Sequence, residues 1–283
     1  MERTVTVERE GLEAAPAAQG AEAFRLNGDP AALAEQLSEL GPVRLRVHSA
    51  HASQAVTQEI TASGWAGNAL WLGGRESGLW LYPAQWSFAF AVGQGEPEAR
   101  QEGLRFVDRD GEVGLTAELT SASDRDAYAR ILRAHQQPAM RRPIIPGRPA
   151  LPAFPGTARY AVDPSLIREL LETLADAAIP VRLELGNKGA LQTYTGHIDN
   201  PVATADGLRV RGAGLGLDLA FAAVASAWVV DIPVPDGRAH TVDLLDDAGE
   251  RILRLAGRRV PGCPEERAWR TLVQALAACR LAS

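Results

Sequence analysis

The sequence repeats itself at a distance of 138 residues, and this repeat constrains the fold more than any other feature. Pro42–Leu45 and Pro180–Leu183 both read Pro-Val-Arg-Leu, and the two copies then align without a gap through residue 119. In this alignment 22 of 78 positions are identical, where roughly seven are expected for a chain of this composition. A period this long corresponds to a domain rather than to a solenoid unit. We therefore predict two copies of one fold with a shared cleft or face between them.

Both copies show the same order of expected elements. A helix opens each copy after an Asp-Pro pair, over 31–40 and from 163 to about 177, because Asp is a good N-cap and Pro a good first helical residue. Short β-type segments separated by Gly, Asn and Asp turns follow, which favours an antiparallel sheet. A helix closes each copy, over 127–135 with Ser123 as the expected cap and over 264–279. The fold class is therefore α+β, an internal duplication of two antiparallel-sheet domains with flanking helices.

These patterns divide the chain into a first repeat at 1–137, a proline-rich linker at 138–156 and a second repeat at 157–283. Before residue 27 we expect a strand or a frayed arm. Prolines recur at every third position from Pro143 to Pro155, which matches the period of a polyproline II helix. The linker is expected to act as a stiff spacer, and a docking site for a proline-reading domain is the alternative.

Composition excludes several classes of protein. The chain has 283 residues, 46% of them apolar, and a net charge of −6, so a large core is available and nucleic acid is not the expected partner. Cys263 and Cys279 form no metal-binding or disulfide pattern. No targeting signal and no apolar run long enough to span a bilayer is found. We expect a cytoplasmic protein that does not enter a membrane. Its oligomeric state stays open.

No nucleotide-binding or hydrolytic signature is present. The glycines at 212, 214 and 216 lack a following helix signal and favour a bend between two strands. His48 and His51 are three residues apart in a turn-like run, where a surface or capping role is favoured over a metal pair.

Two pairs of residues could contact a ligand. Tyr194 and His197 lie in one loop and offer a phenolate and an imidazole as axial donors for a haem iron; the alternatives are a packed sheet aromatic and an exposed histidine. Arg209 and Arg211 are two apart on an expected strand and project from one face, as do Arg44 and Arg46. They could hold the carboxylates of an anionic ligand, or they could form cross-strand salt bridges.

A series of motifs in the second repeat resembles the haemin-degrading HemS/ChuX family of bacterial haem-utilisation proteins. The first repeat matches more loosely, through Leu79–Tyr82, Trp86–Val92, Leu104–Gly111 and Asp124–Leu132. The motifs that carry the resemblance in the second repeat are Gly186–Gly196, Ala227–Val230, Asp236–Gly237, Asp246–Glu250, Gly257–Glu265 and Trp269.

The resemblance implies a duplicated sheet-plus-helix protein that receives haem after import and either passes it to a partner protein or opens the porphyrin with oxygen and an electron donor. In full-length relatives a helical segment after the proline linker supplies the axial histidine. Here Pro155 runs almost directly into the Asp163-Pro164 helix, so that segment is missing. Relatives often carry an arginine over the haem at the position of Trp80.

Three functions therefore stay open at this point. The chain is a haem-binding or haem-transfer protein, with Tyr194 or His197 as iron ligand and Arg209 and Arg211 as further contacts, or a scaffold that kept the fold and lost haem, or an oxygen-dependent haem-degrading enzyme.

Overall fold

The computed structural model describes residues 22–74, 77–94, 101–135, 158–205, 207–235, 237–260 and 262–279. The predicted proline-rich linker lies outside the described residues. The elements of the first repeat are β1 (Glu22–Leu26), α1 (Pro30–Glu35), η1 (Gln36–Leu40), β2 (Pro42–His48), β3 (Ala52–Glu59), β4 (Ala62–Ala66), β5 (Ala69–Gly73), β6 (Ser77–Leu81), η2 (Pro83–Gln85), β7 (Trp86–Gln94), β8 (Gln101–Asp108), β9 (Val113–Leu119) and α2 (Arg125–His135).

The second repeat contains the same strands and α-helices in the same order, and its described residues have no counterpart of the 3₁₀ turn η1. Its elements are β10 (Ala158–Val162), α3 (Leu166–Asp176), β11 (Val181–Gly186), β12 (Ala190–Gly196), β13 (Val202–Thr204), β14 (Gly207–Gly212), β15 (Leu215–Leu219), η4 (Phe221–Ala223), β16 (Ser226–Val234), β17 (Gly237–Leu245), β18 (Arg251–Gly257) and α4 (Arg267–Ala278). The duplication is therefore a property of the fold as well as of the sequence.

The strands form two antiparallel sheets of nine, and each sheet contains strands from both repeats. Sheet A has the order β1-β7-β8-β9-β2-β3-β15-β14-β13, and sheet B has the order β10-β16-β17-β18-β11-β12-β6-β5-β4. Six strands of each sheet come from one repeat and three from the other. Each repeat thus donates a three-stranded meander to the sheet of its neighbour, and the two orders become identical when the repeats are interchanged.

The α+β duplication with antiparallel sheets is confirmed, but the repeats do not form separate sheets. Their boundaries at 137 and 157 stay a prediction. At the two seams β3 pairs with β15 and β12 pairs with β6. Gln54 and Gln192, which are equivalent residues 138 positions apart, lie at the contact between the repeats: Nε2 of Gln54 donates to the Gln192 carbonyl at 3.4 Å, and Nε2 of Gln192 donates to the Leu45 carbonyl at 2.9 Å.

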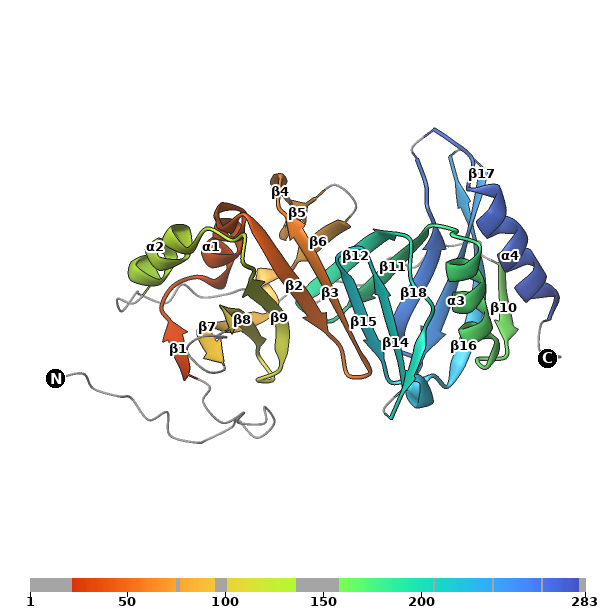
Figure 1. Cartoon of the computed structure of the whole chain (residues 1–283), viewed down its shortest axis with the longest axis horizontal. Coiled ribbons are helices and arrows are strands. Elements are labelled where there is room, and N and C mark those ends of the chain that lie inside the picture. Colours follow the sequence, from red (N-terminus) through yellow and green to blue (C-terminus); the bar gives the residue numbers. More distant parts are fainter. Residues whose placement is uncertain are drawn as a thin grey trace.

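Each sheet has an inner and an outer face. The inner faces pack against each other where β2 and β3 lie against β11 and β12. Toward the two ends of the molecule the helices cover them, α1 and α2 at one end and α3 and α4 at the other (Figure 1). Along β2 the inner residues Val43, Leu45 and Val47 are fully buried, whereas the alternate residues are partly exposed. Burial of each such side chain contributes about 1.5–3 kcal/mol, so the inner faces hold the core.

The helix ends follow the predicted chemistry with two corrections. Asp29 accepts a bond from the Ala31 N–H at 2.9 Å, and Pro30 opens α1. However, the predicted helix over 31–40 is α-helical only to Glu35 and continues as a 3₁₀ turn. The cap of α2 is Asp124, which accepts from the Ala127 N–H at 2.8 Å. Ser123 instead donates to the Pro42 carbonyl at 2.5 Å, so it ties the loop to β2.

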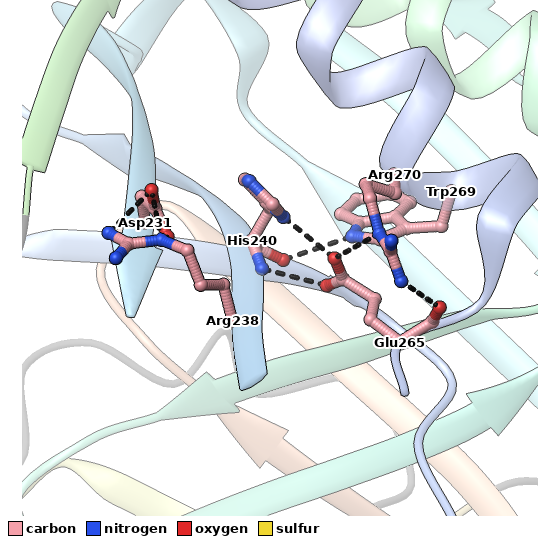
Figure 2. A network of polar contacts seen from close by, with 6 residues as sticks. All are labelled: Asp231, Arg238, His240, Glu265, Trp269 and Arg270. Carbon is pink, nitrogen blue, oxygen red and sulfur yellow. Dashed lines mark hydrogen bonds and ion pairs between the residues drawn. The ribbon is translucent and has the colours of Figure 1, made fainter. Parts of the chain in front are cut away.

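The segment before α4 is fixed to β17 by a buried carboxylate. Glu265 has 4% of its surface exposed; its carboxylate accepts the His240 backbone N–H at 2.7 Å and faces the His240 imidazole at 2.7 Å (Figure 2). Trp269, on the first turn of α4, donates its indole N–H to the His240 carbonyl at 3.0 Å. In the first repeat Tyr128 of α2 donates in the same way to Gly103 of β8. Both closing helices are thus anchored to equivalent strands.

Candidate functional site

The outer faces of the two sheets are the candidate binding surfaces. Within the described chain the helices lie against the inner faces, and the outer positions of the central strands are partly exposed. The two outer faces are related by the duplication, yet their residues differ. Near the two seams, sheet B displays aromatic side chains and sheet A displays arginines.

The outer face of sheet B carries two tryptophans on neighbouring strands. Trp71 on β5 lies directly across from Trp80 on β6, and Trp80 lies across from Leu191 on β12. All three are partly exposed, whereas the alternate residues of these strands, such as Leu79 and Leu81, are fully buried on the inner face. We call Trp71, Trp80 and Leu191 the tryptophan platform.

Glycines allow Trp71 to lie flat on the sheet. A Cβ atom on Gly73 would collide with the Trp71 ring, and one on Gly78 would lie 3.3 Å from its Nε1. The indole therefore covers the bare backbone of these glycines and turns its face outward. A flat aromatic surface of this kind suits a planar apolar ligand, because offset stacking contributes about 0.5–1.5 kcal/mol beyond burial.

Charged residues continue this face toward the far strands. Arg254 of β18 makes a two-pronged ion pair with Asp243 of β17, at 2.6 and 2.7 Å. Burial works to lower the pKa of Arg254, but the hydrogen bond and charge of Asp243 outweigh it and raise that pKa. Arg182 and Glu184 of β11 form a second pair at 2.9 Å. These carboxylates therefore already hold the guanidinium groups nearest to them.

Tyr82 follows Trp80 by two residues, directly after β6. Burial raises the pKa of its phenol above the usual value, so the hydroxyl stays protonated at neutral pH. Its backbone N–H donates to the Gly189 carbonyl at 2.9 Å, which fixes the chain where it leaves sheet B for sheet A. The phenol is the titratable group nearest in sequence to the tryptophan platform.

The predicted iron donors Tyr194 and His197 lie together at the end of β12 but differ in access. Tyr194 is 2% exposed and points inward, and its hydroxyl donates to the His197 carbonyl at 2.9 Å. His197 is exposed, and its imidazole has no hydrogen-bond partner among the described residues. A ligand can reach His197 directly, whereas it reaches Tyr194 only if the bond to the His197 carbonyl breaks.

The predicted pair Arg209 and Arg211 lies on the outer face of sheet A. Nε of Arg209 is 2.9 Å from Oδ1 of Asp218 on β15, and Nη2 of Arg211 is 3.4 Å from the same oxygen. Burial works to raise the pKa of Asp218, but the hydrogen bond from Arg209 and the charges of both arginines lower it overall. The arginines project outward while Tyr194 lies in the interior, so these predicted contacts do not share one surface.

Other features add no further candidate. Among the described residues no group of three or more His, Cys, Asp and Glu side chains could hold a metal ion. A hollow of about 530 Å³ between the start of α3 and the β13–β15 segment is lined by Arg168, Leu208 and Phe221, among others. None of the predicted site residues lines it. No helix in the described part of the chain is long and apolar enough to cross a membrane.

The sequence indicated the two arginine pairs as candidate contacts and marked Trp80 only as the position where relatives often carry an arginine, so neither Trp80 nor Trp71 was predicted as a binding residue. The signal for Trp71 was available, because Leu70, Trp71 and Leu72 repeat the apolar alternation of Leu79, Trp80 and Leu81. What the sequence did not contain was the cross-strand pairing that brings the two indoles together.

Comparison with known proteins gives a consistent result. The model of the haemin-degrading HemS/ChuX domain matches this chain twice, at residues 7–135 and 147–276. The hemin transport protein HemS of Yersinia enterocolitica is 23% identical over 292 aligned residues, which cover 88% of this chain and 84% of HemS.

Two solved structures share the fold over nearly the whole chain. ChuS, an E. coli heme oxygenase, superposes with a TM-score of 0.79 at 20% identity, covering 90% of this chain and 88% of ChuS. Holo-PhuS, a heme-binding protein from Pseudomonas aeruginosa, superposes with a TM-score of 0.79 at 23% identity, covering 90% of this chain and 87% of PhuS.

The fold and its outer faces thus define a duplicated α+β protein whose repeats exchange three-stranded meanders and leave two unlike sheet surfaces exposed. Both repeats match the same family model. The chain belongs to the haemin-degrading HemS/ChuX family.

Proposed function

We propose that this protein binds haem on the outer face of sheet B, in the cytoplasm, and passes it to a partner protein after uptake. The observation that carries the proposal is the tryptophan platform. In a member of this family, a cross-strand pair of indoles lies uncovered on β5 and β6 of sheet B.

The platform fits the macrocycle of haem. A porphyrin is flat and largely apolar, and it stacks well on aromatic rings that lie parallel to a sheet. The relatives named above include a heme-binding protein and a hemin transport protein, and stacking on Trp71 and Trp80 is how this chain would do the same. When bound, haem supplies a redox-active iron; the protein residues supply the surface that holds it.

His197 and Tyr194 remain the proposed donors to the iron, with His197 the more accessible. His197 lies six residues beyond Leu191 in the direction of β12, a distance of roughly 20 Å at ~3.3 Å per residue. A haem held by His197 would therefore lie away from Trp80. Stacking on the platform and ligation by His197 are two modes of binding that substitutions can separate.

Transfer is favoured over degradation because the platform faces solvent. Oxygen chemistry on an iron is controlled by a site from which water is excluded, and in the described chain the helices cover only the opposite faces of the sheets. An exposed platform instead allows a partner protein to reach the bound haem. Degradation is the second candidate, since the family model describes a haemin-degrading domain.

Titration of the purified protein with haemin tests the proposal. We expect a Soret band at one haem per chain, and an affinity at least about tenfold weaker in Trp80→Ala. Trp65→Ala is the matched control, because Trp65 is exposed on β4 but points to the other side of the sheet, where it donates to Glu35. His197→Ala and Tyr194→Phe report ligation through the position of the band.

Each outcome discriminates between the functions. Loss of the band in His197→Ala but not in Trp80→Ala would assign binding to His197 and remove the platform from the proposal. Decay of the band with ascorbate and oxygen would establish degradation instead of transfer. No band at any haemin concentration would contradict haem binding and leave a scaffold.

A further inference from the structure

Four arginines gather on the outer face of sheet A at the seam between the repeats. Arg44 and Arg46 come from β2 of the first repeat, and Arg209 and Arg211 come from β14 of the second. We call these four residues the arginine cluster. They are brought together only because β15 of the second repeat pairs with β3 of the first.

Small residues form the floor of the cluster. Across the sheet, Arg46 pairs with Ala55, Ala55 with Gly216, and Gly216 with Arg211. A Cβ atom on Gly216 would lie 3.1 Å from Nη2 of Arg44 and 3.4 Å from Nη1 of Arg211. The guanidinium groups of Arg44 and Arg211 therefore converge over Gly216, from opposite sides and from different repeats.

The positive charge of the cluster is only half compensated. Glu118 forms ion pairs with both Arg44 and Arg46, with Nε–Oε distances of 3.7 and 3.5 Å. Asp218 forms ion pairs with both Arg209 and Arg211, at 2.9 and 3.4 Å. Four guanidinium groups thus share two carboxylates. The guanidinium groups of Arg44 and Arg211 converge over Gly216, and like charges brought together repel one another. An anion between them would remove the repulsion.

His48 provides an independent sign of positive potential on this face. It follows Arg46 by two residues on the outer side of β2. Burial, together with the charges of Arg46 and Arg105, lowers the pKa of His48 to about 4. Arg105 lies in the same cross-strand row as Arg46, with Thr116 between them, so cationic character extends beyond the cluster.

The fold does not require these arginines. On sheet B the duplication places Trp71, Gly73 and Trp80 where sheet A has Arg209, Arg211 and Asp218, and it places Gly78 where sheet A has Gly216. The glycine of the floor is kept on both sheets. One outer face is therefore built for a flat apolar group and the other for negative charge.

We propose that the arginine cluster binds an oxyanion, a phosphate or a carboxylate of a small ligand, between Arg44 and Arg211 over Gly216. Guanidinium groups bind such anions with two parallel hydrogen bonds, and two converging forks can hold one anion from both sides. This site is separate from the tryptophan platform and does not depend on haem binding.

Calorimetric titration at low ionic strength, with no haemin present, tests the site. One arm uses inorganic phosphate and the other a metal-free porphyrin that carries two propionates. Arg44→Gln and Arg211→Gln should each weaken binding about tenfold, the effect of losing one charge-assisted contact. Arg168→Gln is the matched control, because Arg168 is an exposed arginine paired with Glu172 on α3.

Glu118→Gln should change the affinity for the anion in the opposite direction to the arginine substitutions. It removes the carboxylate that competes for Arg44 and Arg46, so binding should tighten several-fold. Binding of phosphate alone would identify a phosphorylated ligand, and binding of the porphyrin alone would identify a carboxylate. Absence of binding in both arms, an equal loss in Arg168→Gln, or porphyrin binding that depends on Trp80 but not on Arg44 would overturn the proposal.

Discussion

His48 is a histidine that its surroundings keep neutral. Its imidazole is partly buried on the outer face of sheet A, with the charges of Arg46 and Arg105 close by. Its backbone carbonyl accepts a bond of 2.6 Å from the Asn187 side chain, so the residue also lies where the β11–β12 hairpin touches the other repeat.

This arrangement predicts a loss of stability in acid. The pKa of His48 falls from 6.5 to about 4 on folding. Between these values the unfolded chain binds a proton that the folded chain does not, so the free energy of unfolding decreases as the pH falls from 6.5 to 4, by at most about 3 kcal/mol. Urea titrations at several pH values measure this slope. His48→Gln should flatten it, and parallel curves for the two proteins would show that His48 has no part in it.

At the residue scale, the sequence predicted on which face of a strand a side chain lies better than it predicted which distant residues that side chain meets. The two-residue spacing of Arg209 and Arg211 correctly placed both on one face. The expected alternative of cross-strand salt bridges is also present, with Asp218 directly across from Arg209. Arg44 could not be assigned to the same cluster, because it is 165 positions from Arg209 and no local pattern connects them. The convergence over Gly216 depends on the seam alone.

The start of α4 shows how one element is held by a few polar contacts. The carboxylate of Glu265 binds the backbone and the side chain of His240, and Arg270 donates to the Glu265 carbonyl at 2.7 Å (Figure 2). These bonds fix the start of α4, whose Trp269 and Val273 are fully buried against sheet B. The polar contacts thus set the position of an apolar helix face.

Removal of this carboxylate should loosen α4. Glu265→Gln leaves buried donors imperfectly paired and should lower the free energy of unfolding by about 2–4 kcal/mol. Asp231→Asn is the matched control on the neighbouring strand: Asp231 pairs with the half-exposed Arg238, and such pairs contribute about 1 kcal/mol or less. Chemical denaturation compares the two variants. Equal losses would mean that Glu265 is no more important than a surface ion pair.

At the element scale, the sequence predicted helices and strands because their signals are local. Asp29 and Pro30 mark the start of α1, and the amphipathic stripe with Trp269 marks α4. The change from α-helix to 3₁₀ turn after Glu35 was not predicted, since Leu37 and Leu40 continue the helical spacing of Leu33. All three leucines are fully buried, so packing against the core sets the local geometry there.

The exchange of strands between the repeats is a property of the whole molecule. β6 presents the same inner leucines whether it pairs with β3 of its own repeat or with β12 of the other, so the alternation pattern is identical in both cases. The similarity of the two repeats adds to the ambiguity, because β3 and β12 offer equivalent edges with which β6 could pair. The sequence could therefore predict two copies of one fold but not which copy completes which sheet.

The exchange makes each repeat depend on the other. Residues 1–137 alone would lack β15 as the partner of β3 and β12 as the partner of β6. Residues 157–283 alone would lack β6 as the partner of β12 and β3 as the partner of β15. Unpaired central edges of this length expose backbone groups and inner leucines, and they drive association.

We expect that neither half, expressed alone, forms a folded monomer, and that the two halves mixed together form a 1:1 complex. Size-exclusion chromatography with light scattering and circular dichroism, with the intact chain as reference, measures both properties. A folded monomeric half would mean that the meander can return to its own sheet, and that the seam carrying the arginine cluster is one of two available arrangements.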